Sequence, residues 1–199
     1  MPMTQAPAGK QRIMDVAAGL FIERGVNGAS LRQIADLVGM KAGSLYYHFG
    51  SKNELLSAIF KRGIEVMVTA FDEADSATSH LSGRERVGAH VRAHLAALFE
   101  NGPYTAAHVT AFRTAPAQVR DAIVPVRDDY EAMWTNLLRE LVSSGALINS
   151  APLGLHRLLL FGAMNASVEW FDPSRGNLDD LADAITSQFW DGLAQEAPA

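Results

Sequence analysis

Apolar residues recur every three or four positions along most of the chain, a spacing that is typical of amphipathic α-helices. The sequence has neither the strict alternation typical of β-strands nor hairpin turn signals or an internal repeat. We therefore expect an all-α fold of about nine helices. The longer predicted helices cover residues 10–24, 52–74, 82–100, 104–113, 115–144, 152–171 and 178–193, and two short ones lie between residues 30 and 49.

Three segments carry the pattern of a capping box, in which a serine caps the first turn of a helix and an acid or amide three residues later reaches back to it. These segments are residues 30–33, 51–54 and 82–85. Each comes directly before an apolar run, so each marks the predicted start of a helix.

The two short helices have the spacing of a helix-turn-helix. Ala35 is small where two helices must cross closely, and Gly39 follows four residues later, where a tight turn needs a left-handed backbone. Leu45 lies six residues beyond Gly39 and would anchor the second helix on the first. The second helix ends in Tyr-Tyr-His-Phe at residues 46–49, a surface able to form hydrogen bonds and to stack, which points to DNA.

This segment resembles the DNA-binding domain of TetR-family transcriptional regulators from Lys10 to Phe60. The family pattern has a glycine after the first helix, a Ser/Thr cap, Ile-Ala, Ala/Val-Gly, Leu-Tyr-x-x-Phe, Ser-Lys and an acidic-Leu-Leu run. The chain carries it as Gly25, Ser30, Ile34-Ala35, Val38-Gly39, Leu45-Tyr46-Tyr47-His48-Phe49, Ser51-Lys52 and Glu54-Leu55-Leu56. It departs from the family at Lys41-Ala42, where relatives often have serine then lysine, so the recognition helix should lack a cap. Its operator sequence therefore cannot be copied from relatives.

Seven residues are expected to contact DNA: Ser30, Lys41, Ser44, Tyr46, Tyr47, His48 and Lys52. Recognition helices place side chains against base edges while flanking groups hold phosphates. Ser44 and Tyr47 are therefore expected at base edges or at the adjacent DNA backbone, Lys41 at either, and His48 and Lys52 at phosphates. Lys52 also begins a helix whose N–H groups attract phosphate. Tyr46 either reaches DNA through its hydroxyl or packs inside, and both interpretations stay open.

Charge is divided unevenly along the 199 residues, although the net charge is −5. Residues 1–62 hold eight Lys/Arg and four Asp/Glu, which gives +4, and residues 63–199 hold nine and eighteen, which gives −9. A basic end suits contact with phosphates, and an acidic remainder is repelled by the duplex. The acidic balance of the whole chain therefore does not argue against DNA binding.

The composition also indicates the cellular compartment in which the protein is expected. The chain has no cysteine, so neither a disulfide framework nor a thiolate metal site is possible. Its N-terminus lacks a basic-then-apolar signal segment, and no apolar run reaches the length needed to cross a bilayer. We expect a cytoplasmic protein with no membrane partner.

We expect three regions along the chain: a loose N-terminal segment at residues 1–9, a DNA-binding domain at 10–55, and a helical domain for ligand binding and dimerisation at 56–199. Apolar side chains from three helices of the last region either line a cavity or form ordinary core. The ligand-binding candidates are Phe99, Val109, Phe112, Arg113, Tyr130, Met133, Trp134 and Leu137.

The family resemblance implies an effector. TetR-like regulators bind a small molecule between these helices, and the ligand favours a dimer that releases its operator. Residues 127–131, 161–165 and 169–173 further resemble family members that regulate fatty-acid and steroid breakdown, whose ligands are often acyl-CoA thioesters. We therefore expect a repressor that binds a palindromic operator and is released by a small apolar effector. Arg113, Arg120 or Arg127 would meet the phosphates of a CoA group.

The last two predicted helices are unusually apolar, so they either cover the protein's own core or form a two-fold dimer. Paired helix-turn-helix units need a dimer, because their recognition helices must lie about 34 Å apart to enter successive major grooves. TetR-like regulators dimerise through these helices, which implies a homodimer. The candidate interface residues are Leu158, Gly162, Asn165, Leu181, Ile185 and Phe189. Asn165, polar on an apolar helix, either fixes the register of the dimer or belongs to the ligand site.

No catalytic or metal site emerges from the sequence. His90 and His94 are spaced to share a metal, but no third ligand lies nearby, so we expect solvated or capping histidines. Asp128 and Asp129 point to different helix faces and are poor acid–base partners. No Gly-rich phosphate loop or Gly-x-Ser-x-Gly motif is present. We expect no enzyme activity and no cofactor; the alternative is a carrier or enzyme for apolar ligands whose N-terminal domain has lost DNA binding.

Overall fold

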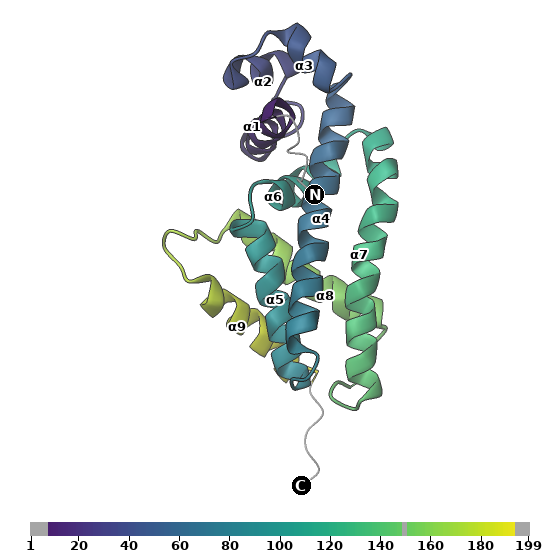
Figure 1. The fold of residues 1–199 in the computed structure, drawn as a ribbon. Helices are drawn as coiled ribbons and strands as arrows, with labels where there is room; N and C mark the ends of the chain where they lie inside the picture. Colours follow the sequence, from purple (N-terminus) through teal and green to yellow (C-terminus); the bar gives the residue numbers. More distant parts are fainter. Residues whose placement is uncertain (1–7, 149–150, 194–199) are drawn as a thin grey trace, which may run out of the picture. The chain divides into compact units, whose positions relative to one another are not determined.

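A computed structural model of the chain describes residues 8–148 and 151–193, and in this part of the chain the fold is all-α, as the sequence predicts (Figure 1). The described residues form nine α-helices and two short 3-10 helices. They are α1 (Ala8–Arg24), α2 (Leu31–Val38), α3 (Ala42–His48), α4 (Lys52–Thr78), α5 (Gly83–Phe99), α6 (Tyr104–Ala111), η1 (Phe112–Thr114), α7 (Ala117–Ser143), α8 (Leu153–Ala166), η2 (Ser167–Glu169) and α9 (Leu178–Asp191).

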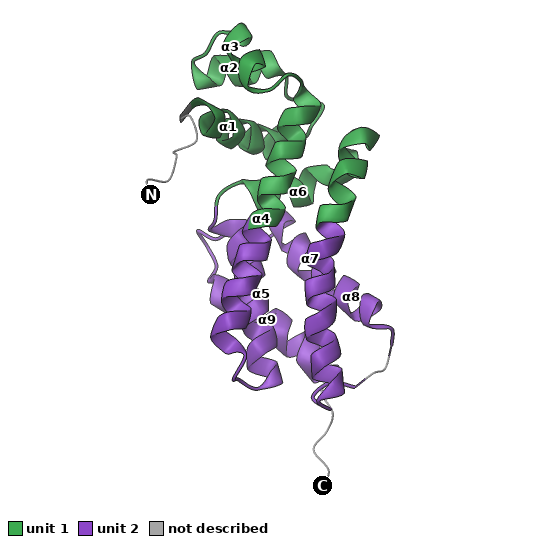
Figure 2. Cartoon of the chain, turned by 45° about the vertical axis from the view of Figure 1, so that its right-hand side comes forward, with its two compact units in different colours: residues 1–65, 102–126 green, residues 66–101, 127–199 purple. Residues whose placement is uncertain are grey.

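The chain divides into two compact units (Figure 2). Unit 1 contains residues 1–65 and 102–126, and unit 2 contains residues 66–101 and 127–199. The long helices α4 and α7 each begin in unit 1 and end in unit 2. The domain boundary expected after residue 55 falls inside α4 and stays a prediction. The predicted loose segment at 1–9 lies mostly outside the described residues, and its last two residues already belong to α1.

Unit 1 is built on a core from its three N-terminal helices and the start of α4. Ile13, Phe21, Ile34 and Leu45 are almost completely buried there. Local signals in the sequence explain where α2 begins and ends. Ser30 and Gln33 form the predicted capping box of α2, and Gly39 ends this helix with φ 76°, in the left-handed region that glycine adopts without strain.

Unit 2 has an aromatic core that joins α4, α5, α7 and α8. Tyr130 and Trp134 of α7 are buried against Phe71, His94 and Phe161, with ring centroids 5.6–6.4 Å apart. Stacked, tilted and edge-to-face ring pairs of this kind stabilise a core beyond the area they bury.

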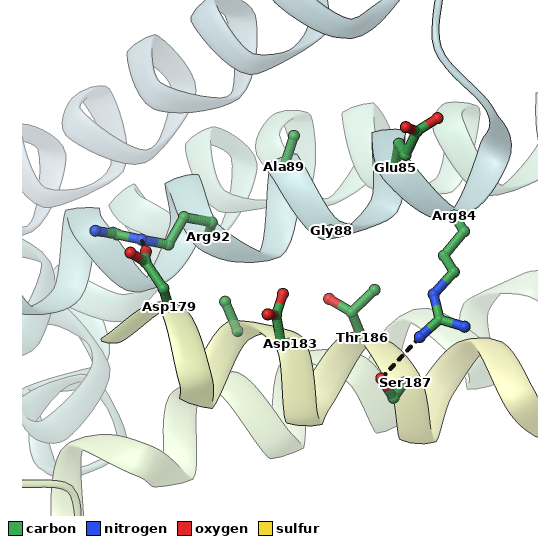
Figure 3. A pocket seen from close by; sticks show the side chains of 10 residues that line it. Arg84, Glu85, Gly88, Ala89, Arg92, Asp179, Asp183, Thr186 and Ser187 are labelled. Atoms are coloured by element: carbon green, nitrogen blue, oxygen red, sulfur yellow. Dashed lines mark hydrogen bonds and ion pairs between the residues drawn. The ribbon is translucent and has the colours of Figure 1, made fainter. Parts of the chain in front are cut away.

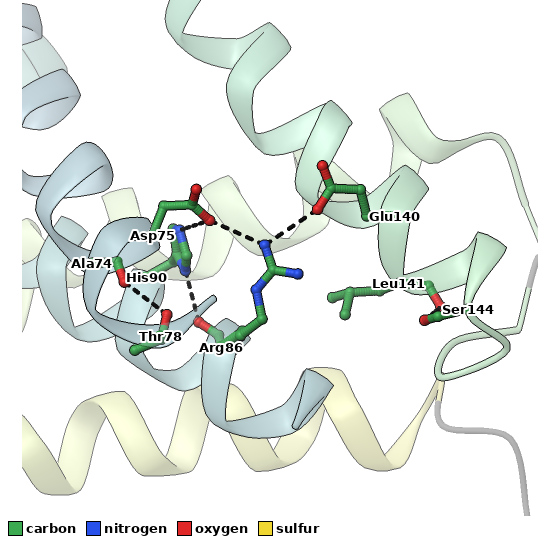
Figure 4. Close-up of polar contacts among 8 residues, drawn as sticks. All are labelled: Ala74, Asp75, Thr78, Arg86, His90, Glu140, Leu141 and Ser144. Atoms are coloured by element: carbon green, nitrogen blue, oxygen red, sulfur yellow. Dashed lines mark hydrogen bonds and ion pairs between the residues drawn. The ribbon is translucent and has the colours of Figure 1, made fainter. Parts of the chain in front are cut away.

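A second cluster in unit 2 is polar and ties α5 to α4 and α7 (Figure 4). The Arg86 guanidinium lies 3.0 Å from the Asp75 carboxylate and 3.2 Å from the Glu140 carboxylate. The Arg86 carbonyl accepts a hydrogen bond of 2.7 Å from Nδ1 of His90. Because the side chain of Arg86 is largely buried, its two carboxylate partners compensate for the lost hydration.

Two expectations were wrong in this unit. His90 and His94 are neither solvated nor capping, because both lie inside α5 and face the aromatic core. In the described part of the chain no three His, Cys, Asp or Glu side chains are grouped as metal ligands. The helix predicted over 152–171 ends at Ala166, because the buried Ser167 hydroxyl donates to the Met164 carbonyl and the chain tightens into η2.

Among the described residues every helix is too short or too polar to span a bilayer.

Candidate nucleic-acid interface

The recognition helix of the predicted helix-turn-helix is α3, a seven-residue helix in unit 1. Leu45 and Phe49 are buried and hold it on the core, while the opposite side of the helix faces solvent. Ser44 and Tyr47 are exposed there and lie one helical turn apart. Tyr47 is 89% exposed, so its ring and hydroxyl take almost no part in the packing of the protein.

Tyr46 is also exposed on α3, at 55%, which favours the interpretation in which it can reach DNA. His48, at the end of the helix, is half-buried, and its ring meets the Tyr47 ring edge-on at 5.7 Å between centroids. These two side chains therefore support each other at the end of the exposed surface.

Lys41 stands at the N-cap of α3 and its side chain makes no capping hydrogen bond. The loss of a cap that the sequence predicts at Lys41-Ala42 is therefore confirmed. The Lys41 side chain is exposed and carries a positive charge next to Ser44. Its charge is available to a phosphate or a base edge.

Lys52 is placed differently from the other predicted contacts. Its ammonium group donates a hydrogen bond to the Val26 carbonyl, and the side chain is half-buried. Burial lowers the pKa of the Lys52 ammonium. Lys52 therefore has a hydrogen-bond partner within unit 1. To make the predicted phosphate contact, its ammonium group must bind the Val26 carbonyl and a phosphate at the same time.

Ser30 lies at the start of α2 and keeps its hydroxyl exposed while accepting a hydrogen bond of 3.2 Å from the Gln33 N–H. Sequence reasoning did not assign Arg32, an exposed cation in the first turn of the same helix. A basic side chain near a predicted phosphate contact was the available signal. The exposed groups of α2 and α3 together provide cations, hydroxyls and aromatic rings, the groups that bind duplex DNA.

The predicted ligand-binding residues fall in both units. Val109, Phe112 and Arg113 belong to unit 1, and the remaining five to unit 2. Tyr130, Trp134 and Leu137 are buried in the aromatic core described above, whereas Phe99, Val109, Phe112 and Met133 are half-buried and Arg113 is exposed. A ligand cavity around these residues stays a prediction.

Two grooves flank α9 in unit 2. The groove toward α8 has a volume of about 350 Å³ and is mainly apolar; it includes the predicted interface residues Ile185 and Phe189 together with Leu159 and Ala163. The groove toward α5, about 540 Å³, is lined mostly by residues with charged or hydroxyl side chains (Figure 3). Ion pairs of Arg92 with Asp179 and of Arg84 with Asp191 join the two helices beside it.

The predicted interface residues differ in exposure. Leu158 is 57% exposed on α8 and Gly162 is exposed beside it, while Leu181, Ile185 and Phe189 on α9 are half-buried. Asn165 is half-buried and makes a hydrogen bond within its own unit. The exposed apolar side chains of α8 therefore form a face that the monomer leaves uncovered.

A helical core, a helix-turn-helix whose first helix is capped, and an exposed recognition helix together define a helix-turn-helix DNA-binding protein. Residues 13–59 match the model of bacterial regulatory proteins of the tetR family, and residues 80–193 match the tetracyclin repressor-like C-terminal domain. The chain belongs to the TetR family of transcriptional regulators.

Two of the proteins that match most of this chain are transcriptional repressors. The HTH-type transcriptional repressor KstR2 of Rhodococcus jostii is 26% identical over 194 residues, covering 96% of this chain and 94% of that protein. KstR2 of Mycolicibacterium smegmatis is 24% identical over 176 residues, covering 85% of this chain and 82% of that protein.

Solved structures share the fold. The ketosteroid transcriptional regulator KstR2 of Mycobacterium tuberculosis superposes with a TM-score of 0.80 at 21% identity, covering 96% of this chain and 98% of that one. AibR, solved with isovaleryl coenzyme A and operator DNA, gives a TM-score of 0.78 at 22% identity, covering 92% and 98%. These likenesses establish the common helical architecture.

Proposed function

We propose that this protein is a repressor that binds a palindromic operator as a homodimer and leaves it when a small apolar effector binds. The observation that carries the proposal is the exposed surface of α3, where Ser44 and Tyr47 are free to reach base edges while Leu45 holds the helix on its core. The protein then acts in the cytoplasm, where its operator lies.

The uncovered face of α8 supports the homodimer. Leu155, Leu158 and Leu159 are 49–62% exposed, and they lie on the helix that borders the apolar groove toward α9. Apolar side chains that gather on one face of a soluble protein mark an interaction surface. A two-fold dimer would bury this face and would pair two recognition helices for one palindrome.

For the effector we propose an acyl-CoA thioester. The structural relative AibR was solved with isovaleryl coenzyme A, and an acyl chain would need a cavity beside the predicted ligand-binding residues of unit 2. Of the predicted phosphate contacts, Arg127 belongs to unit 2; it pairs with Glu131 at 3.1 Å and would exchange this partner for a phosphate. The ligand releases the operator only to the extent that it binds the DNA-free state of the dimer more tightly than the DNA-bound state.

Selection of duplexes from a pool of random-sequence DNA tests the proposal. The expected result is enrichment of one palindromic sequence, bound by the purified protein in a gel shift and released by isovaleryl-CoA or a longer acyl-CoA. Enrichment without release would overturn the effector class alone. Failure to enrich any sequence would overturn the regulator and would favour a carrier or enzyme for apolar ligands.

A further inference from the structure

Helix α6 belongs to the same compact unit as the predicted DNA-binding helices. It begins at Tyr104, directly after a turn in which Gly102 has φ 91° and Pro103 ends the loop. Its first two residues make hydrogen bonds to two different helices of unit 1. These two contacts fix the position of α6 relative to α1 and to α4.

The first contact joins α6 to α1. The Tyr104 hydroxyl donates a hydrogen bond to the Asp15 carboxylate, and the Gln11 side-chain amide donates to the Tyr104 hydroxyl and, at 3.1 Å, to Asp15. Tyr104 is only 5% exposed. Burial, followed by the hydrogen bond to Asp15, raises the pKa of Tyr104, so the hydroxyl keeps its proton and remains a donor at neutral pH.

The second contact joins α6 to α4. The buried Thr105 hydroxyl donates a hydrogen bond of 3.0 Å to the Gly63 carbonyl. A Cβ atom at Gly63 would lie 2.6 Å from the Tyr104 carbonyl oxygen, so only glycine permits this approach of the two backbones. The start of α6 is therefore held on both sides.

Helix α1 continues the connection to the recognition helix. The Lys10 ammonium lies 5.2 Å from the centroid of the Phe49 ring, and Phe49 is the C-cap of α3. Lys10 and Asp15 are on one helix, separated by roughly 7–8 Å along its axis at the usual rise per residue. A rigid helix thus touches α6 at one point and the end of α3 at another.

We propose that Tyr104 is a positioning residue for DNA recognition: by binding Asp15 it fixes α1, and through Phe49 the end of α3, to α6. The proposal rests on the DNA-binding function proposed above, because it concerns the placement of α3 at the duplex.

The test compares two affinities of the full-length protein: for the duplex that the wild type selects from random DNA, and for an unrelated duplex. Tyr104→Phe keeps the ring and removes the hydroxyl. We expect its affinity for the selected duplex to fall on the order of tenfold while its affinity for unrelated DNA is unchanged. A purely structural loss would lower the folded fraction and so reduce both affinities equally.

The control on the same helix is Thr110→Ala, which removes a hydroxyl that bonds only to the Ala106 carbonyl within α6. It should leave both affinities unchanged. Hydrogen exchange adds a readout without DNA: the amides of α1 should exchange faster in Tyr104→Phe than in Thr110→Ala. Faster exchange with an unchanged ratio of affinities would make the contact merely structural and would overturn the proposal.

A second pair of variants addresses the α4 side. Gly63→Ala should displace α6 and lower the ratio of specific to non-specific affinity, whereas Gly19→Ala, where a Cβ meets nothing within 4 Å, should not. If the wild type selects a duplex and Tyr104→Phe binds it as tightly, this inference fails and the proposed function stands. If the wild type selects none, the proposed function itself fails.

Discussion

His94 on α5 and Asn165 on α8 form a partly buried hydrogen bond, with the His94 Nε2 atom 2.9 Å from the Asn165 Oδ1 atom. Because Oδ1 can only accept, Nε2 carries the proton. The other ring nitrogen, 2.8 Å from the Tyr130 hydroxyl, therefore accepts the hydroxyl hydrogen. One neutral imidazole thus joins α5, α7 and α8 inside unit 2.

Replacing Asn165 tests the stabilising role of this bond. Asn165→Ala leaves the His94 Nε2–H without a partner in the core, and we expect it to lower the free energy of unfolding by about 1–3 kcal/mol. Urea denaturation measures the loss. The exposed residue Gln118 provides the comparison, since Gln118→Ala should change stability by less than about 0.5 kcal/mol. Equal stability of the two variants would contradict a structural role for Asn165.

His94 should also make the protein sensitive to acid. Burial lowers the pKa of His94 to about 4, compared with 6.5 for an ordinary histidine. Between these values the unfolded chain binds more protons than the folded one, so the free energy of unfolding falls as the pH decreases through this window. The slope from one such group is at most about 1.4 kcal/mol per pH unit.

The measurement is urea unfolding from pH 6.5 down to pH 4 for the wild type and for His94→Gln. Glutamine does not titrate, so the variant should lose less stability over this range. His90, whose pKa burial also lowers, remains in both proteins and cancels in the comparison. His80→Gln, at an exposed histidine, should behave as the wild type does. Parallel curves for the wild type and His94→Gln would refute the assignment.

Local signals in the sequence predicted the helices well. The capping boxes at Ser30 and Ser82 are both present in full, because each depends only on residues three positions apart. The box expected at Ser51 is half formed: the Ser51 hydroxyl accepts from the Glu54 N–H, but the Glu54 carboxylate binds the Gly50 N–H instead. Even there the helix begins where the sequence predicts.

The polar contacts that join distant segments could not be predicted in this way. Tyr104 and Asp15 are 89 residues apart, and His94 and Asn165 are 71 apart. Apolar periodicity indicates which face of a helix is buried, but it does not say which polar group of another helix will meet it. For this reason the sequence predicted solvated or capping histidines where the structure buries His90 and His94.

Tyr47 should be important for DNA binding and unimportant for folding. It is 89% exposed, so Tyr47→Ala should leave the melting temperature nearly unchanged. Loss of a base or backbone contact should weaken binding to the selected duplex by about 1–3 kcal/mol. Leu37→Ala removes an exposed side chain from α2 and serves as the comparison in the same gel-shift series. Unchanged affinity of Tyr47→Ala would remove Tyr47 from the interface.

Replacing Lys41 and Lys52 in turn should distinguish a loss of electrostatic attraction to DNA from a loss of protein stability. Lys41 is exposed, so Lys41→Ala should reduce affinity for all DNA sequences and lower the salt dependence by about one phosphate contact, without loss of stability. Lys52→Ala should in addition destabilise the protein, because Lys52 donates to the Val26 carbonyl. Binding measured against salt concentration, together with thermal melts, distinguishes the two. If Lys52→Ala is as stable as the wild type, the hydrogen bond from Lys52 to the Val26 carbonyl does not stabilise the protein.

The uncovered face of α8 gives a prediction about association. Leu159 is 62% exposed, so Leu159→Glu should fold as well as the wild type and sediment as a monomer at concentrations where the wild type is a dimer. Leu37, 58% exposed in unit 1, is the matched control, and Leu37→Glu should remain dimeric. If Leu159→Glu sediments with the wild type, the interface lies elsewhere.

The central claim is that α3 reads DNA as one of a symmetric pair, and footprinting on the selected duplex tests it most directly. We expect two protected half-sites related by a two-fold axis, with centres about one helical turn or a multiple of it apart. Tyr47→Ala should lose protection at both half-sites together. A single asymmetric footprint, or protection that persists in Tyr47→Ala, would contradict it.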